Sequence, residues 1–306
     1  MQNGQSLKRL KNSTTSQHDL GPICPVCEVG SGKPWGSDAG LAIFDCSSCN
    51  SKFFERPITD INDYREYYPY LRDFDHARAM AELDIRYRQA SSKILAIKKL
   101  TQRNPIRLLD VGSGPGYFVK HACDAGIDAV AGEINADAVN FGEKHFDIRF
   151  ANIVRCEPES FDVITMFHVL EHIEYPTSFL KMCLTALKRG GLVYIHVPVA
   201  DPLQMRAQMT IKMLLRKRTE RRGTLYAPDH VTGFSPEGIK RLLQHAGMEV
   251  QSISKVGILS AEFDPLFWRF RAHDVNQWPI MGMEIVRGGI DWINGGSWLR
   301  VLATKI

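Results

Sequence analysis

Four of the seven cysteines form two pairs whose spacing is that of a metal site. The pairs are Cys24-Pro-Val-Cys27 and Cys46-Ser-Ser-Cys49, with eighteen residues between them. A gap of two residues lets both thiolates of a pair face one ion, and two such pairs complete a tetrahedron of sulfur. Four unrelated thiols or a redox motif are the alternatives, but a redox motif needs one such pair, not two. We expect a structural zinc ribbon with no open coordination position.

A glycine-rich turn joins an apolar run to a helical pattern further along the chain. Leu108–Val111 leads directly into Gly112-Ser-Gly-Pro-Gly116. Glycine lets the backbone approach a ligand closely, and the N–H groups of the following helix point toward that ligand. Tyr117 stands where the dinucleotide fingerprint has glycine or alanine. Glu133, twenty-one residues beyond Gly112, follows a second apolar run, where a carboxylate accepts the hydroxyls of a ribose. A turn used only for tight packing is the alternative.

These features together resemble the class I S-adenosylmethionine (SAM)-dependent methyltransferases of the ubiquinone-biosynthesis or methyltransferase-23 type. The resemblance covers about residue 76 to the C-terminus and rests on Leu109–Gly116, Glu133, Phe161–Ile164, Leu187–Gly191 and Trp298–Lys305. It implies a Rossmann-like α/β fold with a seven-stranded, mostly parallel sheet, helices on both faces, and SAM as the cofactor. It also implies a set of cofactor-binding residues: Asp110, Gly112, Ser113, Gly114, Gly116, Glu133, Asn152 and Phe167. In such enzymes the acid and glycines contact the methionyl part, Glu133 the ribose and Asn152 the adenine edge.

Histidines and a glutamate follow the apolar run Phe161–Phe167. They are His168, Glu171 and His172, and His230 lies later, just before a helical pattern. If the first three are helical, their spacing places them on one face. Imidazole, with an ordinary pKa near ~6.5, accepts a proton at neutral pH. We expect His168, His172 and His230 to be catalytic.

Two interpretations of this group remain open. The set His168, Glu171, His172 and His230 is similar to the metal site of small-RNA 2′-O-methyltransferases and some quinone O-methyltransferases, with His168 in place of a glutamate. It would then hold a second divalent metal. Otherwise the segment is the loop and helix start of metal-free relatives, and a histidine acts as a base or contacts the ligands. His196 could reach the same crevice, whereas three other histidines in helical patterns are expected at the surface or in packing: His121, His145 and His245.

The elements that position these residues alternate between apolar runs and helical patterns, which indicates a parallel sheet with helices on both faces. The helical patterns include His76–Leu100, Tyr117–Ala125, Asn135–His145, Thr177–Lys188 and Pro236–Ala246. The runs 249–258 and 298–306 are predicted to close the sheet as a pair of strands. We divide the chain into a flexible tail (1–20), a zinc ribbon (21–56), a helical lead-in or cap (57–104) and a methyltransferase domain (105–306) with a basic lid insert at 200–230.

The net charge of +4 over 306 residues is concentrated in one segment. Asp201–Arg222 has seven basic and two acidic residues, an excess of five, so the remaining chain has a charge of −1. Three interpretations are open: a helix with a solvated basic face, a lid whose cations meet an anionic acceptor, or a helix on an anionic membrane surface. The aromatic stretch Tyr64–Phe74 is expected to pack a helix or to form the wall opposite the lid.

No apolar run approaches the ~18 residues of a membrane span, and an odd number of cysteines fits a reducing compartment. We therefore expect a cytoplasmic enzyme that methylates a hydroxyl of a small, anionic or neutral molecule, such as a sugar or natural-product intermediate. The alternatives are a tRNA or small-RNA methyltransferase, which would bind phosphate through the ribbon and the insert, and a non-catalytic binding module. Neither hydrolase nor P-loop chemistry is supported, because the sequence has no GxSxG motif and Lys33 follows a glycine without the phosphate-loop spacing.

Overall fold

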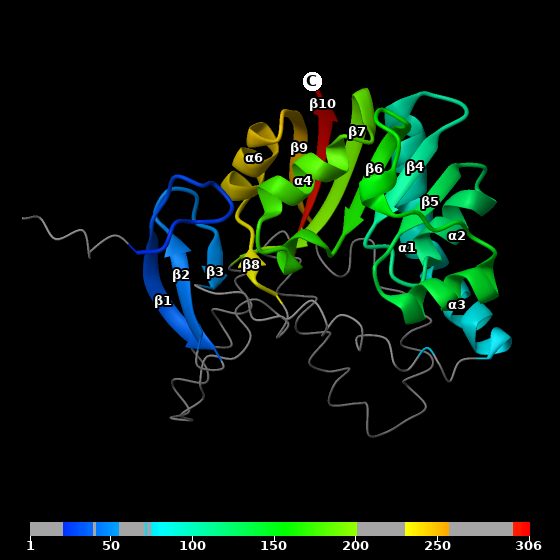
Figure 1. Ribbon diagram of the computed structural model, residues 1–306, viewed down its shortest axis with the longest axis horizontal. Coiled ribbons are helices and arrows are strands. Elements are labelled where there is room, and N and C mark those ends of the chain that lie inside the picture. Colours follow the sequence, from blue (N-terminus) through cyan, green and yellow to red (C-terminus); the bar gives the residue numbers. More distant parts are fainter. Residues whose placement is uncertain (1–20, 39–40, 55–70, 72–74, 201–229, 257–295) are drawn as a thin grey trace, which may run out of the picture.

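The computed structural model describes residues 21–38, 41–54, 71, 75–200, 230–256 and 296–306 (Figure 1). The predicted N-terminal tail, the basic insert and nearly all of the aromatic stretch lie outside the described residues. Within the described part of the chain, no helix is long and apolar enough to cross a membrane.

The centre of the fold is a mixed sheet with the strand order β5-β4-β6-β7-β10-β9. Its strands are β4 (Arg107–Val111), β5 (Asp128–Gly132), β6 (Phe161–Phe167), β7 (Leu187–Pro198), β9 (Met248–Val256) and β10 (Trp298–Lys305). Strands β5, β4, β6 and β7 are parallel, and β10 pairs antiparallel with both β7 and β9. The first six residues of β6 are buried, as expected for a parallel strand covered on both faces. The Rossmann-like α/β fold is thus confirmed.

The predicted seventh strand is wrong for the described residues, where this sheet has six strands. Next to β5, the chain near Phe150 makes a single parallel bridge with Ala131. Two backbone hydrogen bonds support the bridge: Ala131 donates to Arg149 and Ala151 donates to Ala131, both at 2.8 Å. The segment follows the sheet for too few residues to form a strand.

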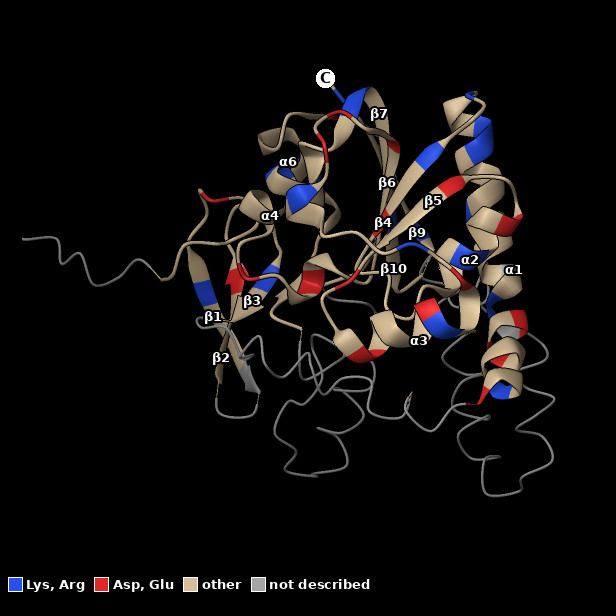
Figure 2. Ribbon diagram, turned by 45° about the vertical axis from the view of Figure 1, so that its right-hand side comes forward, with Lys and Arg blue, Asp and Glu red and all other residues tan. Residues whose placement is uncertain are grey.

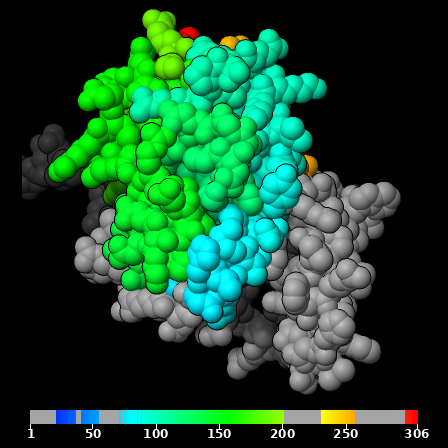
Figure 3. Space-filling view, turned by 90° about the vertical axis from the view of Figure 1, so that its right-hand side faces the viewer, coloured from blue at the N-terminus to red at the C-terminus, as the bar shows by residue number. Residues whose placement is uncertain are grey.

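Helices cover both faces of the sheet, and each face has its own apolar core. On one face lie α1 (His76–Thr101), α2 (Tyr117–Asp124) and α3 (Ala136–Phe146), and on the other α4 (Pro176–Leu184) and α6 (Pro236–His245). In Figure 3 the cyan atoms of α1 adjoin the greener atoms of later residues. Lys, Arg, Asp and Glu are spread over the described elements with both signs interspersed (Figure 2).

The helix predicted over Thr177–Lys188 ends early, at Leu184, because the chain then enters β7. Leu187 pairs with Phe161 and Leu192 pairs with Val163, so β7 contains a bulge between these pairs. Gly190 in that bulge has φ 68°, a left-handed conformation that favours glycine.

The N-terminal part forms a second, antiparallel sheet to which the later chain contributes a strand. The order is β1 (Gly32–Asp38), β2 (Leu41–Cys46), β3 (Lys52–Phe54) and β8 (Thr232–Gly233). Figure 1 shows β8 on the side of this sheet that faces the central one. The ribbon is therefore continuous with the main domain through backbone pairing.

Candidate active site

The glycine loop after β4 is shaped by three residues in the left-handed region. Gly112, Gly114 and Gly116 have φ values of 68°, 54° and 84°, which any side chain would strain. A Cβ atom on Gly112 would also lie 2.5 Å from Cγ2 of Val169. The loop is thus packed directly against the residue that follows His168.

Glu133 connects the end of β5 to this loop through backbone hydrogen bonds. Its Oε2 accepts from the N–H of Gly114 at 2.8 Å, and its Oε1 accepts from Ile134 at 2.7 Å and Asn135 at 2.9 Å. Three donors fix the carboxylate but do not fill its approximately four lone-pair positions. The half-buried carboxylate can therefore accept a further hydrogen bond from a ligand.

Asp110 is a buried acid near the carboxyl end of β4, two residues before Gly112. It accepts a hydrogen bond from Oγ1 of Thr165 at 2.6 Å. Burial raises the pKa of Asp110 to about 7, although the Thr165 hydrogen bond and the positive charge of Lys93 oppose the rise. A ligand with an ammonium group nearby would favour the ionised carboxylate.

Lys93 is a residue of this region that sequence reasoning missed. It is only 9% exposed, and its Nζ lies 4.7 Å from the ring centroid of Phe167. The available signal was its position in α1, where it shares the buried face with Ala90, Ile94 and Ile97. A cation at such a position is unusual unless it has a partner.

These residues fit the cofactor that the sequence resemblance implies. The Oγ of Ser113 is buried and has no hydrogen-bond partner among the described residues, so it has capacity for a polar ligand. Asn152, expected at the adenine edge, accepts from the N–H of Val154 at 3.1 Å. Phe167 makes edge-to-face contacts with three rings: Phe118, Tyr194 and His196.

A carboxylate and two imidazoles meet beside the loop. One ligand atom from each of Glu171, His172 and His230 lies within 4.8 Å of the others, and the two imidazole centroids are 4.7 Å apart. Glu171 is completely buried, with no hydrogen bond from the described residues to either oxygen. Burial favours a higher pKa, but the neighbouring imidazoles outweigh it and keep the pKa of Glu171 below its ordinary value. We call these three residues the His/Glu cluster.

His168 lies at the margin of this cluster. The expected helix is reduced to one 3-10 turn, Leu170–His172, and His168 precedes it with φ 61°. Its Nδ1 is 3.4 Å from Oε1 of Glu171, and its ring makes an edge contact with Trp298 at 4.4 Å. The left-handed residue turns the chain so that His168 approaches Glu171 without sharing a helical face with it.

The other histidines lie elsewhere or contact the site only indirectly. His121 is buried in α2, and its Nε2 lies 2.9 Å from the carbonyl oxygen of Leu83. His145 stacks on His76, and His245 is exposed. His196 is buried against Phe167, and its carbonyl accepts a hydrogen bond from the N–H of His168 at 3.0 Å.

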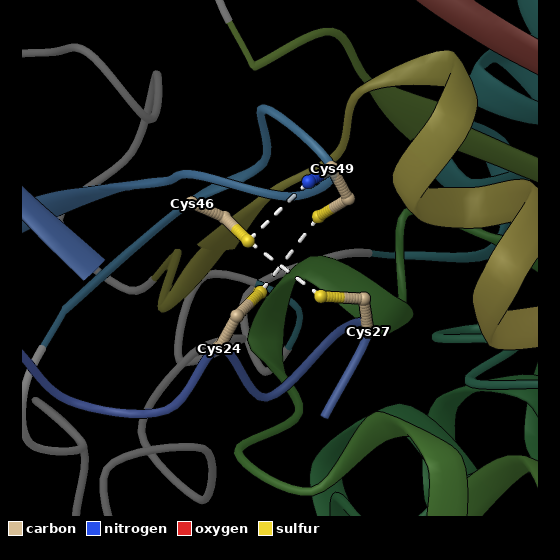
Figure 4. A group of neighbouring side chains, drawn as sticks. All are labelled: Cys24, Cys27, Cys46 and Cys49. Carbon is tan, nitrogen blue, oxygen red and sulfur yellow. Dashed lines mark hydrogen bonds between the residues drawn. The ribbon is translucent and has the colours of Figure 1, made fainter. Parts of the chain in front are cut away.

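The four N-terminal cysteines converge on one point (Figure 4). The sulfurs of Cys24 and Cys49 are 3.8 Å apart, and those of Cys27 and Cys46 are 3.5 Å apart. A tetrahedron with metal–sulfur bonds of about 2.3 Å has edges of about 3.8 Å, so the donor set fits a single zinc ion. The backbone N–H groups of Ser48 and Cys49 also donate to the Cys46 sulfur, both at 3.4 Å.

Comparisons with known proteins agree with this geometry. A sequence model of the family described as "Methyltransferase domain" matches residues 82–253. Ubiquinone biosynthesis O-methyltransferases from Xanthomonas euvesicatoria and Xanthomonas campestris are 28% and 27% identical to this chain over 180 residues, which span 54% of this chain and 69% of each relative.

Among solved structures, a chain of the complex between the Haloferax volcanii Trm112 methyltransferase activator and a methyltransferase has a TM-score of 0.51. The identity is 14%, with coverage of 79% of this chain and 97% of that one. That similarity concerns the fold alone. The family match extends over more than half of the chain and includes the glycine loop, Glu133 and the His/Glu cluster. The chain therefore belongs to the methyltransferase-domain family and is a class I SAM-dependent methyltransferase.

Proposed function

We propose that this enzyme methylates a hydroxyl oxygen of a small-molecule acceptor and that histidines next to the cofactor loop assist deprotonation. The observation that carries the proposal is the packing of Val169 on Gly112. It places the segment with His168, Glu171 and His172 beside the loop that would hold the cofactor. The relatives named for ubiquinone biosynthesis are O-methyltransferases, which supports oxygen as the methylated atom.

The cofactor supplies a methyl group on a sulfonium, which is already activated for in-line displacement. The chain's own residues must then orient the acceptor, exclude water and receive its proton. We assign Asp110, the loop glycines and Glu133 to cofactor binding, with Ser113, Asn152 and Phe167 beside them. His172 or His230 would accept the acceptor O–H proton on an imidazole nitrogen, so that the oxygen could displace the methyl group from the sulfonium, whose sulfur keeps the electron pair of the broken S–CH₃ bond. The ionised carboxylate of Glu171 stabilises the resulting imidazolium.

A divalent cation in the His/Glu cluster is the second way in which this site can activate a hydroxyl. One buried carboxylate and two imidazoles provide three ligands of suitable type, and His168 is close enough to Glu171 to orient it. A bound cation would lower the pKa of the acceptor hydroxyl. The four cysteines are assigned to a separate, structural zinc ion.

The RNA alternative depends on the basic insert, which lies outside the described residues, so we propose the small-molecule acceptor. The anionic character expected of the small-molecule acceptor also depends on that insert. The proposal predicts that residues 200–230 contact the acceptor. Once the acceptor is identified, crosslinking with a labelled product can test this contact.

The test uses SAM with an isotopically labelled methyl group and two pools from cells, small metabolites and total RNA. We expect label in a small molecule, and fragmentation in the mass spectrometer should place it on oxygen. His230→Ala should slow transfer by about 10²-fold or more, while His245→Ala, on the exposed part of α6, should leave the rate unchanged. Label in RNA, or on nitrogen or carbon, would overturn the proposal. Activity lost on chelation while the ribbon zinc is retained would select the metal-assisted version.

A further inference from the structure

The short strand β8 connects the ribbon to the His/Glu cluster. In the ribbon sheet, Phe53 pairs with Thr232, and the N–H of Phe54 donates to the carbonyl of Val231 at 3.2 Å. On its other side, the N–H of Val231 donates to the carbonyl of Glu171 at 2.8 Å. His230 immediately precedes Val231, so two backbone hydrogen bonds fix the chain at this histidine.

A second set of contacts joins the ribbon to the start of α6. Ser235, the N-cap of that helix, donates its backbone N–H to Oγ of Ser51 at 3.2 Å, and its own Oγ donates to the carbonyl of Cys49. Arg241, two turns further on, donates from Nη1 to Oγ of Ser48 at 2.7 Å. On the ribbon, the residues that contact α6 are thus Cys49, a predicted zinc ligand, and its neighbours Ser48 and Ser51.

Helix α6 packs tightly against the ribbon at Gly238. A Cβ atom on Gly238 would lie 2.0 Å from Oγ of Ser51 and 3.2 Å from Cγ1 of Val26. Ser51 and Val26 are both fully buried, and Val26 lies between the two cysteines of the first pair. Val26 and Ser51 therefore both lie close to Gly238, and Figure 4 shows the yellow helix on the side of the cysteine group where Cys27 and Cys49 lie.

We propose that the ribbon is a positioning element for the acceptor side of the active site. Folded around its metal, it holds β8 and the α6 N-terminus so that His230 stays against Glu171 and His172. A two-residue strand has little stability of its own, and a ribbon with so small a core depends on its metal for folding. The inference rests on the proposed zinc centre and on the proposed role of the cluster.

Hydrogen exchange of the full-length, zinc-loaded protein tests this coupling without an acceptor. The wedge variant is Gly238→Ala, whose new methyl group meets Ser51, and the matched control is Lys240→Ala on the exposed side of the same helix. In the wedge variant, amides in 230–234 and 170–173 should exchange about tenfold faster or more, with β4 and β6 unchanged. Affinity for S-adenosylhomocysteine, measured by calorimetry, should change by less than about twofold, and removal of zinc should reproduce the pattern.

A second variant separates the wedge from a general loss of stability. Ser51→Ala alone removes the hydrogen bond that Ser235 donates to the ribbon without adding volume to α6, so amides in 230–234 should again exchange faster while β4 and β6 stay unchanged. Unchanged exchange at 230–234 after zinc removal would overturn the proposal, as would equal acceleration in β4 and β6. A zinc count of zero in the purified protein would also overturn it. The label-transfer experiment can fail while this coupling is observed, because the exchange readout involves no methyl transfer.

Discussion

Replacing Asp110 by asparagine should stabilise the cofactor-free protein, and the gain should increase with pH. The Asp110 pKa is raised by burial from 3.8 to about 7. Between these values the folded state binds a proton that the unfolded state has lost, so stability falls as pH rises toward 7. Each pKa unit corresponds to about 1.36 kcal/mol, which gives a cost of about 1.5 kcal/mol at pH 5 and about 4 kcal/mol at pH 8. The asparagine side chain has no such cost and keeps an oxygen acceptor for Thr165.

The assay is urea unfolding of the cofactor-free protein at pH 5 and pH 8, with Asp124→Asn on the surface of α2 as the control. The advantage of the variant over wild type should grow by about 2–3 kcal/mol between the two pH values. S-adenosylhomocysteine, whose ammonium group favours the carboxylate, should stabilise wild type more than the variant at pH 8. A variant that is less stable than wild type by the same amount at both pH values would refute the reasoning, because Asp110 would then be ionised throughout in a stabilising pair with Lys93.

Three further changes examine the other parts of the site. Cys27→Ser should reduce the zinc content, measured by elemental mass spectrometry, from about one per chain to nearly zero; an unchanged content would place the metal elsewhere. Gly112→Ala adds both a strained φ and a clash with Val169, so it should cost more than the ~1 kcal/mol of strain alone and weaken S-adenosylhomocysteine binding. Gly126→Ala, with φ 81° but open space around its Cβ, is the matched control, and equal losses in both would show that the clash is unimportant. Glu133→Gln should weaken cofactor binding by about tenfold, as expected for one charge-assisted hydrogen bond; unchanged affinity in calorimetry would move the ribose contact to another residue.

The family and the residues proposed for the site could be predicted because their signals are local in sequence. The cysteine pairs, the glycine loop and Glu133 each depend on spacing within a few tens of residues, and the comparisons confirm the family that these residues indicate. The strand and helix bounds were less predictable. The helix expected to reach Lys188 ends at Leu184, because pairing of Leu187 with Phe161 outweighs local helical preference.

The sequence alone determined the α/β class, the four cysteines whose sulfurs converge and the glycine-rich turn after β4, since these follow from residue type and period. Only the tertiary structure placed Lys93 near Asp110, reduced the segment before His172 to a single turn and brought His230 to Glu171. It also joined Ser51 to Ser235, which are 184 residues apart. Such contacts are made by buried polar groups that satisfy one another across elements, and their partners are decided by how the two sheets pack, which no local pattern encodes.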